Sequence, residues 1–401
     1  MNILFLTLNV FENIEMHNIY SDLMKEFAEQ GHRPYIVTPR ERKMGEQTEL
    51  VKFALYSILK VRIGNINNVS FLEKGISTIT LSRYFYRAVK RYLGGITFDL
   101  ILYSTPPITL ADPIKKLKKY FNCKTYLMLK DIFPQNAVDL KLFSKKSPIY
   151  RYFRNVEKKL YAVSDYIGCM SQANVDYILK HNPELNSKIV EICPNSIKVI
   201  DMRIETEERN EIRKKYGLPL DKKIFIYGGN LGRPQGIPFL IQCLNSQKDN
   251  HNAFFFVVGD GTEFGKLEEF FQRVHPKNMK LMKRLPKADY DCIVAACDIG
   301  MIFLDHHFTI PNFPSRLLAY MQAGVPVLAC TDQNTDIGKV IAEGGFGWWC
   351  ESNHVSKFNK IVQQILTQDL KGLKQNAFEQ LAKHYDVKES CQTILKKMEH
   401  T

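Results

Sequence analysis

Short apolar runs alternate with longer amphipathic stretches along almost the whole chain, and this alternation constrains the fold more than any other feature of the sequence. It is typical of βαβ units, in which parallel strands are buried between two layers of helices. A helix is predicted over Tyr20–Glu29, with Gly31 as the glycine that ends it. The strands predicted in the first half are Ile3–Leu8, Pro34–Val37, Leu100–Tyr103, Thr125–Leu129, Tyr166–Cys169 and Ile189–Ile192.

The alternation stops near the middle of the chain and then restarts. Pro194-Asn195-Ser196 and the charged stretch Asp201–Lys215 indicate a linker followed by a solvated helix. The strands predicted beyond it are Ile224–Tyr227, Phe254–Val258, Met279–Leu281, Ile299–Phe303, Val325–Ala329 and Gly347–Trp349. The helices predicted there are about Ile237–Leu244, Thr262–Arg273, Asp289–Ala296, Pro314–Ala323 and Val355–Leu366.

Two consecutive doubly wound domains explain this pattern, and the length of 401 residues suits two domains of roughly 100–200 residues each. We therefore expect an α/β chain with two Rossmann-like domains, 1–194 and 203–385, facing across a cleft. A helix within 386–401, at about Val387–Met398, could cross back to the first domain. Because ligands of such sheets bind beyond the carboxyl ends of the strands, the cleft is the expected active site.

The cysteines and histidines argue against a disulfide framework or a metal centre. Nine Cys are scattered without a C-x-x-C pair, and ten His form no H-E-x-x-H or comparable motif. The apolar segment Met1–Leu8 lacks a basic n-region, and no window approaches 18 uninterrupted apolar residues. We therefore expect a cytoplasmic protein with reduced thiols, no metal and no membrane-spanning helix.

The positive charge of the chain is concentrated in one region. Residues 51–150 hold 17 basic and 5 acidic residues, whereas the rest of the chain holds 38 and 37. Such a region predicts one anionic partner, for example an anionic membrane surface. A nucleic acid is the rival partner, but no helix-turn-helix, zinc-finger or RRM signature supports it.

A helix with a basic face lies inside this region. On a helical wheel one side carries Leu81, Phe85, Ala88, Val89 and Tyr92, and the other carries Arg83, Arg87, Lys90 and Arg91. Such a helix could lie in an anionic membrane interface, or its apolar side could be buried within the domain. Leu50–Leu59 is a second, more apolar candidate, and a charged patch follows at Lys115, Lys116, Lys118 and Lys119.

The second domain carries features suited to a diphosphate. Glycines between Gly228 and Gly236 follow a predicted strand and allow backbone N–H groups to approach an anion. Pro314 fits the first position of a helix, which would leave the N–H groups of Ser315 and Arg316 unpaired beside the Arg316 side chain. Thr262 is expected to cap the helix after Asp260, and the segment Arg284–Lys287 could meet a base edge.

In this order and spacing, these features resemble the nucleotide-binding half of family-4 retaining glycosyltransferases of the GT-B fold. The resemblance covers nearly the whole chain, including the segments Ala323–Ala329 and Lys130–Gln135, the latter similar to bacterial members that build capsule, O-antigen or exopolysaccharide. It implies a sugar transfer with retention from a nucleotide-diphosphate donor, first of all a UDP-sugar, to a lipid-linked saccharide at the inner face of the cell membrane. It implies no metal and no other cofactor.

The chain departs from that family at positions that matter. Asn230 and Gln235 stand where the family has an Arg and a Lys, and Pro311 and Ala319 stand where it has paired glutamates. We expect the donor diphosphate to bind Gly229, Asn230, Arg233, Ser315 and Arg316, with Arg233 and Arg316 as the candidates for the missing positive charge. The resemblance assigns the base and ribose to Arg284, Leu285 and Ala319.

In the first domain, Asp131 and Lys130 are the candidate catalytic residues because they end a predicted strand. The Asp131 carboxylate could bind a sugar hydroxyl or stabilise positive charge at the anomeric carbon, or it could simply cap the next turn. Gln135 is a weaker candidate, and Asn9 and Ser171 are expected to cap loops. A non-hydrolysing sugar-nucleotide epimerase and a non-catalytic GT-B partner are the alternative functions.

Overall fold

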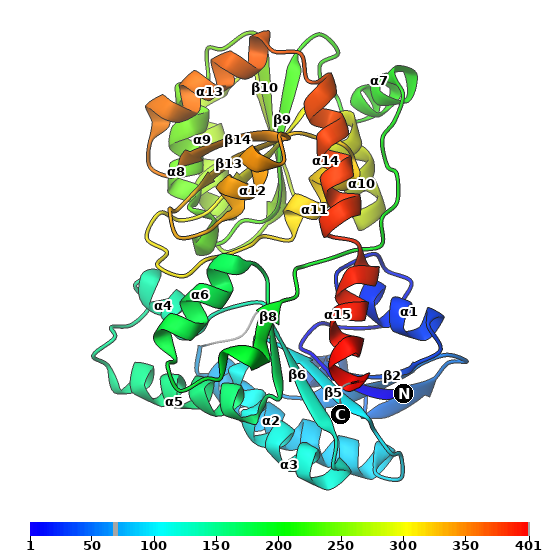
Figure 1. Cartoon of the computed structure of the whole chain (residues 1–401). Coiled ribbons are helices and arrows are strands. Elements are labelled where there is room, and N and C mark those ends of the chain that lie inside the picture. The colour runs from blue at the N-terminus through cyan, green and yellow to red at the C-terminus, as the bar shows by residue number, and fades with distance from the viewer. Residues whose placement is uncertain (67–70, 400–401) are drawn as a thin grey trace. The chain divides into compact units, whose positions relative to one another are not determined.

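The computed structural model describes residues 1–66 and 71–399 and forms two compact units (Figure 1). The first comprises Met1–Lys198 and Val387–Thr401, and the second comprises Val199–Asp386. Each unit contains a parallel or largely parallel sheet with helices on both faces. The predicted class, two doubly wound α/β domains, is confirmed.

The first unit is built on an eight-stranded sheet with the order β3-β4-β2-β1-β5-β6-β7-β8. All neighbouring strands are parallel except the antiparallel pair β3 and β4. The strands are β1 (Asn2–Leu6), β2 (Arg33–Glu41), β3 (Glu49–Lys52), β4 (Ser57–Ile63), β5 (Leu100–Ser104), β6 (Lys124–Leu129), β7 (Tyr166–Cys169) and β8 (Val190–Ile192). The order reverses between β1 and β5, which is where such sheets form a ligand crevice.

Helices cover both faces of this sheet. One face packs on α1 (Ser21–Glu29) and α15 (Val387–Glu399), through side chains such as Phe27 and Ile394. The other face is covered by α2 (Phe71–Leu93), α3 (Ala111–Phe121) and α5 (Pro148–Val163). Two shorter helices, α4 (Gln135–Asp139) and α6 (Gln172–His181), follow strands β6 and β7.

Two expectations about the basic region are wrong. Leu50–Leu59 is not an amphipathic helix, because it forms most of the β3–β4 hairpin at the edge of the sheet. The apolar side of α2 is not free either: Leu81, Phe85 and Val89 are fully buried inside the unit. From Leu81 on, the helix therefore turns its apolar side inward and its basic side, together with the exposed Tyr84, to solvent, as the alternative interpretation held.

The second unit is built on a six-stranded parallel sheet with the order β11-β10-β9-β12-β13-β14. The strands are β9 (Lys223–Asn230), β10 (Ala253–Asp260), β11 (Met279–Met282), β12 (Ile299–Phe303), β13 (Val327–Thr331) and β14 (Gly347–Glu351). The helices are α7 (Thr206–Lys215), α8 (Ile237–Ser246), α9 (Phe264–Val274), α10 (Lys287–Ala296), α11 (Arg316–Gln322), α12 (Ile337–Glu343), α13 (Val355–Thr367) and α14 (Lys371–His384). Helices α8, α9 and α13 bury their apolar faces against one side of the sheet.

Helix α7 is largely solvated, as its charge predicts, with the exception of Arg213. Arg213 is fully buried, its Nε atom donates to the Ala296 carbonyl at 2.8 Å, and its Nη2 atom lies 2.7 Å from Asp298. This buried ion pair, with hydrogen bonds on both partners, fixes α7 to the second unit. None of the helices within residues 1–66 and 71–399 combines the length and hydropathy needed to span a membrane.

Candidate active site

The strand order of the second sheet reverses between β9 and β12, so its ligand crevice is expected beside the end of β9. Strand β9 is longer than predicted, because Gly228, Gly229 and Asn230 continue its pairing with β10. Gly229 has a φ of 111°, which favours glycine. The predicted glycine turn is thus partly the end of a strand.

The turn between β9 and α8 is held together by two amide side chains. Gln235 Oε1 accepts hydrogen bonds from the Gly232 backbone N–H and the Asn230 side-chain amide, both at 3.1 Å. Asn230 and Gln235 stand where the resemblance predicts an Arg and a Lys. In this chain they stabilise the turn and bring no positive charge to it.

A second cation reaches this strand end from another element, Arg316 of α11. Its guanidinium carbon lies 4.5 Å from the centre of the Tyr227 ring, and its Nη2 atom is 3.7 Å from where a Cβ on Gly229 would be. Its Nη1 atom is shielded from water and has no hydrogen-bond partner among the residues that the structure describes. A guanidinium with an unpaired N–H next to the half-buried Gly229 is suited to bind an anion.

Three tyrosines from different elements surround this guanidinium. Burial alone would lower the pKa of Arg316, but Tyr227, Tyr320 and Tyr290 raise it, so its pKa is above the ordinary value and its charge is permanent. The Tyr320 hydroxyl donates to the carbonyls of Ile226 and Met301, while the Tyr290 hydroxyl lies shielded from water. Sequence reasoning missed Tyr290, because a tyrosine at a core-facing helix position carries no signal of its own.

Two predicted helix starts are wrong. Helix α11 begins at Arg316 with Ser315 at its N-cap position, so Pro314 is not its first residue. Leu317 N–H and Leu318 N–H donate to the carbonyls of Pro314 and Ser315, which closes the turn before the helix. Likewise Glu263, not Thr262, stands at the N-cap position of α9. The positive charge beside β9 thus comes from the Arg316 side chain, since α11 is a helix of only seven residues.

The other predicted donor residues lie around the same strand end. Arg233 is exposed at the start of the short 3₁₀ turn Arg233–Gln235, and Ser315 is exposed beside Arg316. Ala319 follows Arg316 by one turn of α11. Arg284 and Leu285 lead into α10, the helix that carries Tyr290.

Gly228 makes a close approach possible between α10 and β9. A Cβ at Gly228 would lie 2.1 Å from the Tyr290 hydroxyl oxygen. We expect Gly228→Ala to lower the free energy of unfolding by about 1–3 kcal/mol through overpacking and to weaken donor binding as well. Gly265→Ala is the matched control, because a Cβ there meets nothing within 4 Å. The alanine should stabilise α9, since alanine has the higher helix propensity. Unchanged melting and nucleotide affinity for Gly228→Ala would contradict this packing.

In the first unit, Asp131 follows β6 at the carboxyl edge of the sheet. Both of its carboxylate oxygens accept from the Asn136 side-chain amide, at 2.9 and 2.8 Å. Burial raises the pKa of Asp131 to about 6, although the Ile132 N–H and Asn136 lower it. A carboxylate that titrates near neutral pH at a sheet edge is a candidate for chemistry.

Lys130 is used differently. Its ammonium group donates to the carbonyls of Cys193 and Pro194, at 3.2 and 3.3 Å, and burial lowers its pKa. Thr105 Oγ1 accepts from the backbone N–H groups of both Lys130 and Asp131. Lys130 and Thr105 therefore fix the backbone that presents Asp131, and neither Thr105 nor Asn136 was identified from the sequence.

The weaker candidates of the first unit are engaged in local hydrogen bonds. Asn9 bonds Thr7 Oγ1 through both its backbone N–H and its side-chain amide. Ser171 donates to Asn174 at 3.0 Å, and Gln135 donates to Asp139 at 2.6 Å.

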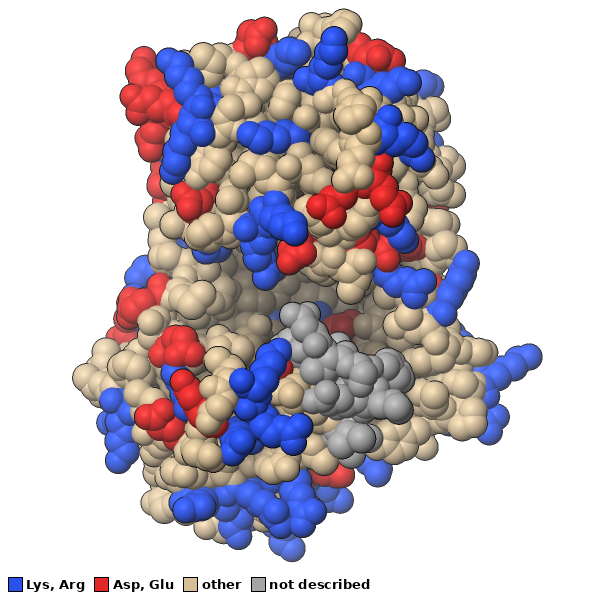
Figure 2. Space-filling view, turned by 180° about the vertical axis from the view of Figure 1, so that it is seen from behind, with Lys and Arg blue, Asp and Glu red and all other residues tan. Residues whose placement is uncertain are grey.

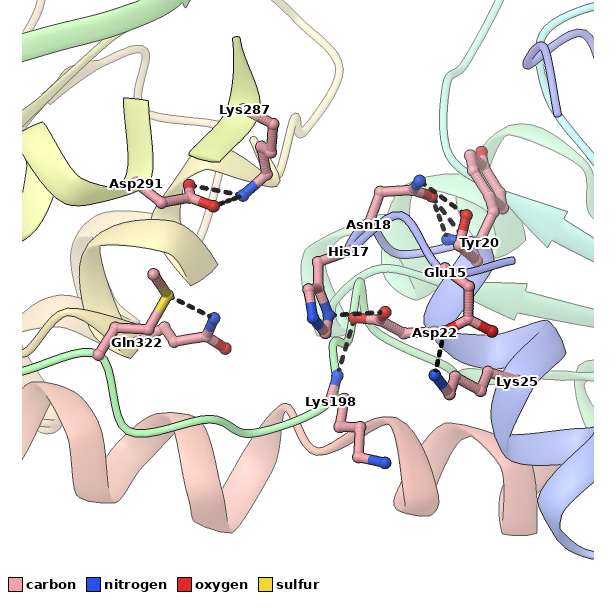
Figure 3. A network of polar contacts seen from close by, with 12 residues as sticks. Glu15, His17, Asn18, Tyr20, Asp22, Lys25, Lys198, Lys287, Asp291 and Gln322 are labelled. Atoms are coloured by element: carbon pink, nitrogen blue, oxygen red, sulfur yellow. Dashed lines mark hydrogen bonds and ion pairs between the residues drawn. The ribbon is translucent and has the colours of Figure 1, made fainter. Parts of the chain in front are cut away.

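The loop after β1, at the same edge of the first sheet, is fixed by a polar network (Figure 3). Asn18 Oδ1 accepts from the Tyr20 and Ser21 N–H groups, and Asp22 lies 3.4 Å from His17 and accepts from the Lys198 N–H. In the second unit, Figure 3 shows the pair Lys287–Asp291 on α10 and the Gln322 side chain on α11. The first set stabilises the loop that leads into α1, and the second lies on the helices that carry Tyr290 and Arg316.

Within the described residues, one group of three could ligate a metal: Asp305, His306 and His307. His307 Nδ1 lies 2.7 Å from Asp305 Oδ1, and the Asp305 N–H donates to the Pro234 carbonyl. This group was not singled out from the sequence, because its spacing matches no common metal motif.

Comparison with known proteins decides the class of enzyme. Residues 208–385, all in the second unit, match the family described as "Glycosyl transferases group 1". The probable glycosyltransferase WbjE of Pseudomonas aeruginosa is 25% identical over 309 residues, which cover 77% of this chain and 75% of that protein. The chain is a glycosyltransferase. The putative colanic acid biosynthesis glycosyl transferase WcaI of Escherichia coli is 21% identical to it over 60% of each protein.

Solved structures share the fold of this glycosyltransferase along its whole length. Sucrose-phosphate synthase from Thermosynechococcus elongatus has a TM-score of 0.78 at 14% identity and covers 100% of this chain and 99% of its own. Anabaena Alr3699/HepE in complex with UDP and glucose has a TM-score of 0.72 at 15% identity over 100% of both chains. The lipopolysaccharide glycosyltransferase WaaG has a TM-score of 0.68 at 16% identity.

Proposed function

We propose that this glycosyltransferase transfers a sugar, with retention, from a UDP-sugar to a lipid-linked saccharide during bacterial surface polysaccharide synthesis. Two relatives support the product class, since their names refer to colanic acid and teichuronic acid biosynthesis. HepE, of the same fold, has been solved with UDP-glucose. The resemblance to family-4 enzymes is the basis for retention, which NMR analysis of the product's anomeric configuration would test.

One observation carries the donor assignment: a permanently charged guanidinium with an unused N–H lies beside the glycine end of β9. A diphosphate leaving group gains negative charge as the glycosidic bond breaks, so a fixed cation there stabilises the transition state more than the ground state. Arg233, Ser315 and the Gly229 and Asn230 backbone would complete the contacts. Arg284, Leu285 and Ala319 would meet the base and ribose.

Asp131 is the proposed catalytic carboxylate. Once ionised, it would stabilise positive charge at the anomeric carbon or hold an acceptor hydroxyl. Lys130 becomes a positioning residue, because its ammonium group is engaged with backbone carbonyls.

Titration with UDP and incubation with a panel of UDP-sugars test this proposal. We expect saturable UDP binding and slow hydrolysis of one donor, with no loss of activity in EDTA because positive side chains serve the diphosphate. An interconversion of sugar nucleotides without transfer would favour the epimerase alternative. A salt-sensitive gel shift without UDP binding would favour the nucleic-acid alternative.

We also propose that the enzyme acts at the inner face of the cell membrane, where a lipid-linked acceptor resides. From residue 81 on, α2, α3 and α5 carry twelve Lys and Arg against two acidic residues, and Figure 2 shows basic side chains gathered along the border that these helices form. The basic residues are Arg83, Arg87, Lys90, Arg91, Lys115, Lys116, Lys118, Lys119, Arg151, Arg154, Lys158 and Lys159. Attraction to an anionic leaflet is worth about 1 kcal/mol for each such residue near the surface.

Replacing the basic side of α2 tests the electrostatic part of this membrane contact. We expect a variant with Arg83, Arg87, Lys90 and Arg91 changed to Gln to bind anionic vesicles more weakly than wild type at low salt. The difference should shrink at high salt, because the attraction is screened over about 8–10 Å. Flotation assays with anionic and zwitterionic liposomes measure it, and equal flotation at low salt would exclude α2 from the contact.

A further inference from the structure

The segment that joins α4 to α5 in the first unit exposes large apolar side chains. Leu142, Ile149 and Tyr152 are 56%, 52% and 52% exposed. Ile149 and Tyr152 lie three residues apart on the first turns of α5 and so share one face of the helix. Single exposed apolar residues need no explanation, but three within one short segment indicate an interaction surface.

The segment has a defined shape that separates buried from exposed apolar groups. The Leu142 N–H donates to the Ala137 carbonyl at 2.9 Å, and Ser147 caps α5 by accepting from the Tyr150 N–H at 3.1 Å. Phe143 and Phe153 both pack edge-to-face on Phe133, with ring centres 6.3 and 4.9 Å away. The apolar residues that the unit can use are therefore packed inward, while Leu142, Ile149 and Tyr152 are held in water.

Basic residues alternate with these apolar ones, and no acidic residue occurs from residue 140 to 156. The basic residues are Lys141, Lys145, Lys146, Arg151 and Arg154. Lys145, Lys146 and Arg151 are exposed and make no ion pair within the part of the chain that the structure describes. Exposed aliphatic and aromatic side chains surrounded by lysines and arginines suit the membrane interface, where the apolar groups contact acyl chains and the basic groups contact anionic headgroups.

We propose that Leu142, Ile149 and Tyr152 insert into the interfacial layer of an anionic bilayer, with the surrounding Lys and Arg on the headgroups. This inference rests on the proposed membrane association and names the contact that holds it. The apolar side of α2 is buried and cannot insert, so the inserting residues belong to the segment between α4 and α5 and to the start of α5. A nucleic acid is disfavoured as the occupant, because Leu142 and Ile149 would gain nothing against phosphates.

Vesicle flotation at low and high salt tests the insertion with a Leu142→Gln, Ile149→Gln double variant. We expect the variant to lose roughly tenfold or more of the vesicle affinity that wild type retains at high salt, since apolar burial is not screened. The matched control is Met44→Gln, Leu55→Gln, because these side chains of the same unit are 53% and 59% exposed. The control variant should float like wild type.

Fluorescence of an Ile149→Trp variant gives a second measurement. We expect a blue shift and quenching by brominated lipids on anionic vesicles, after subtraction of the wild-type signal. Equal high-salt flotation of the double variant and wild type, or an Ile149→Trp signal that vesicles leave unchanged, would overturn the insertion. Failure of wild type to bind any vesicle would overturn membrane association itself. UDP binding, measured without vesicles, reports on the donor-site proposal independently.

Discussion

Replacing Arg316 by alanine should lower kcat/KM for sugar transfer by about thirty- to a thousand-fold, which corresponds to roughly 2–4 kcal/mol of transition-state stabilisation. The reason is geometric. Arg316 is the cation that lies against the glycine end of β9, and its Nη1 atom is shielded from water and unpaired within the described residues. Removing it would leave the departing diphosphate without its nearest fixed charge. UDP affinity should fall together with the rate of transfer.

Three further variants test whether the effect is specific to the Arg316 guanidinium. Arg316→Lys keeps the charge but loses the planar fork, so it should recover only part of the rate. Arg233→Ala should have a smaller effect, because its side chain is exposed. Arg273→Ala, an exposed arginine on α9, is the control and should behave like wild type. Wild-type rate and nucleotide affinity in both Arg316→Ala and Arg233→Ala would exclude the proposed diphosphate site.

Much of the fold could be predicted because the spacing of apolar residues along the chain is a local property of the sequence. Strands such as Tyr166–Cys169 and Ile299–Phe303 were predicted with their observed bounds. The β3–β4 hairpin was missed, since its alternation was interpreted as a helix within a basic region. The burial of the apolar side of α2 could not be decided, because one sequence pattern fits both a core-facing helix and a membrane-facing one.

Only those site residues could be predicted that lie in recognisable local patterns, such as the end of a strand. The strand-end rule identified Asp131, the glycine-rich turn identified Gly229, and a predicted helix start identified Arg316. These patterns could not show that Asn230 and Gln235 bond each other, or that Tyr290 and Asn136 approach these residues. Such contacts join residues that the chain brings together only by folding. The sequence identified Arg316 as a candidate cation for this strand end, but it could not show that the Asn230 and Gln235 amides stabilise the turn beside it.

Replacing Asp131 by asparagine should lower the rate of transfer at least about a hundred-fold, the scale of a single preorganised electrostatic contact. The free energy of unfolding at neutral pH should not fall with the rate, because the substitution removes a carboxylate whose ionisation destabilises the fold. Burial raises the pKa of Asp131 from 3.8 to about 6 in the folded protein. Between about pH 4 and 6 the unfolded chain therefore releases a proton that the folded chain keeps, and stability falls as pH rises through this window. An asparagine side chain cannot ionise, so the Asp131→Asn variant should lose less stability than wild type between pH 4 and 7.

The pH dependence of the rate completes this test, because a turn-capping role and a catalytic role predict different profiles. If the ionised carboxylate acts on the sugar, the wild-type rate should rise with pH through about 6, and the asparagine variant should lack that rise. Asn136→Ala removes an amide that lowers the Asp131 pKa, so its profile should shift to higher pH. Thermal melting of each variant from pH 4 to 8 accompanies the rates. An asparagine variant with full rate and a lower melting temperature would make Asp131 a structural cap of the turn after β6.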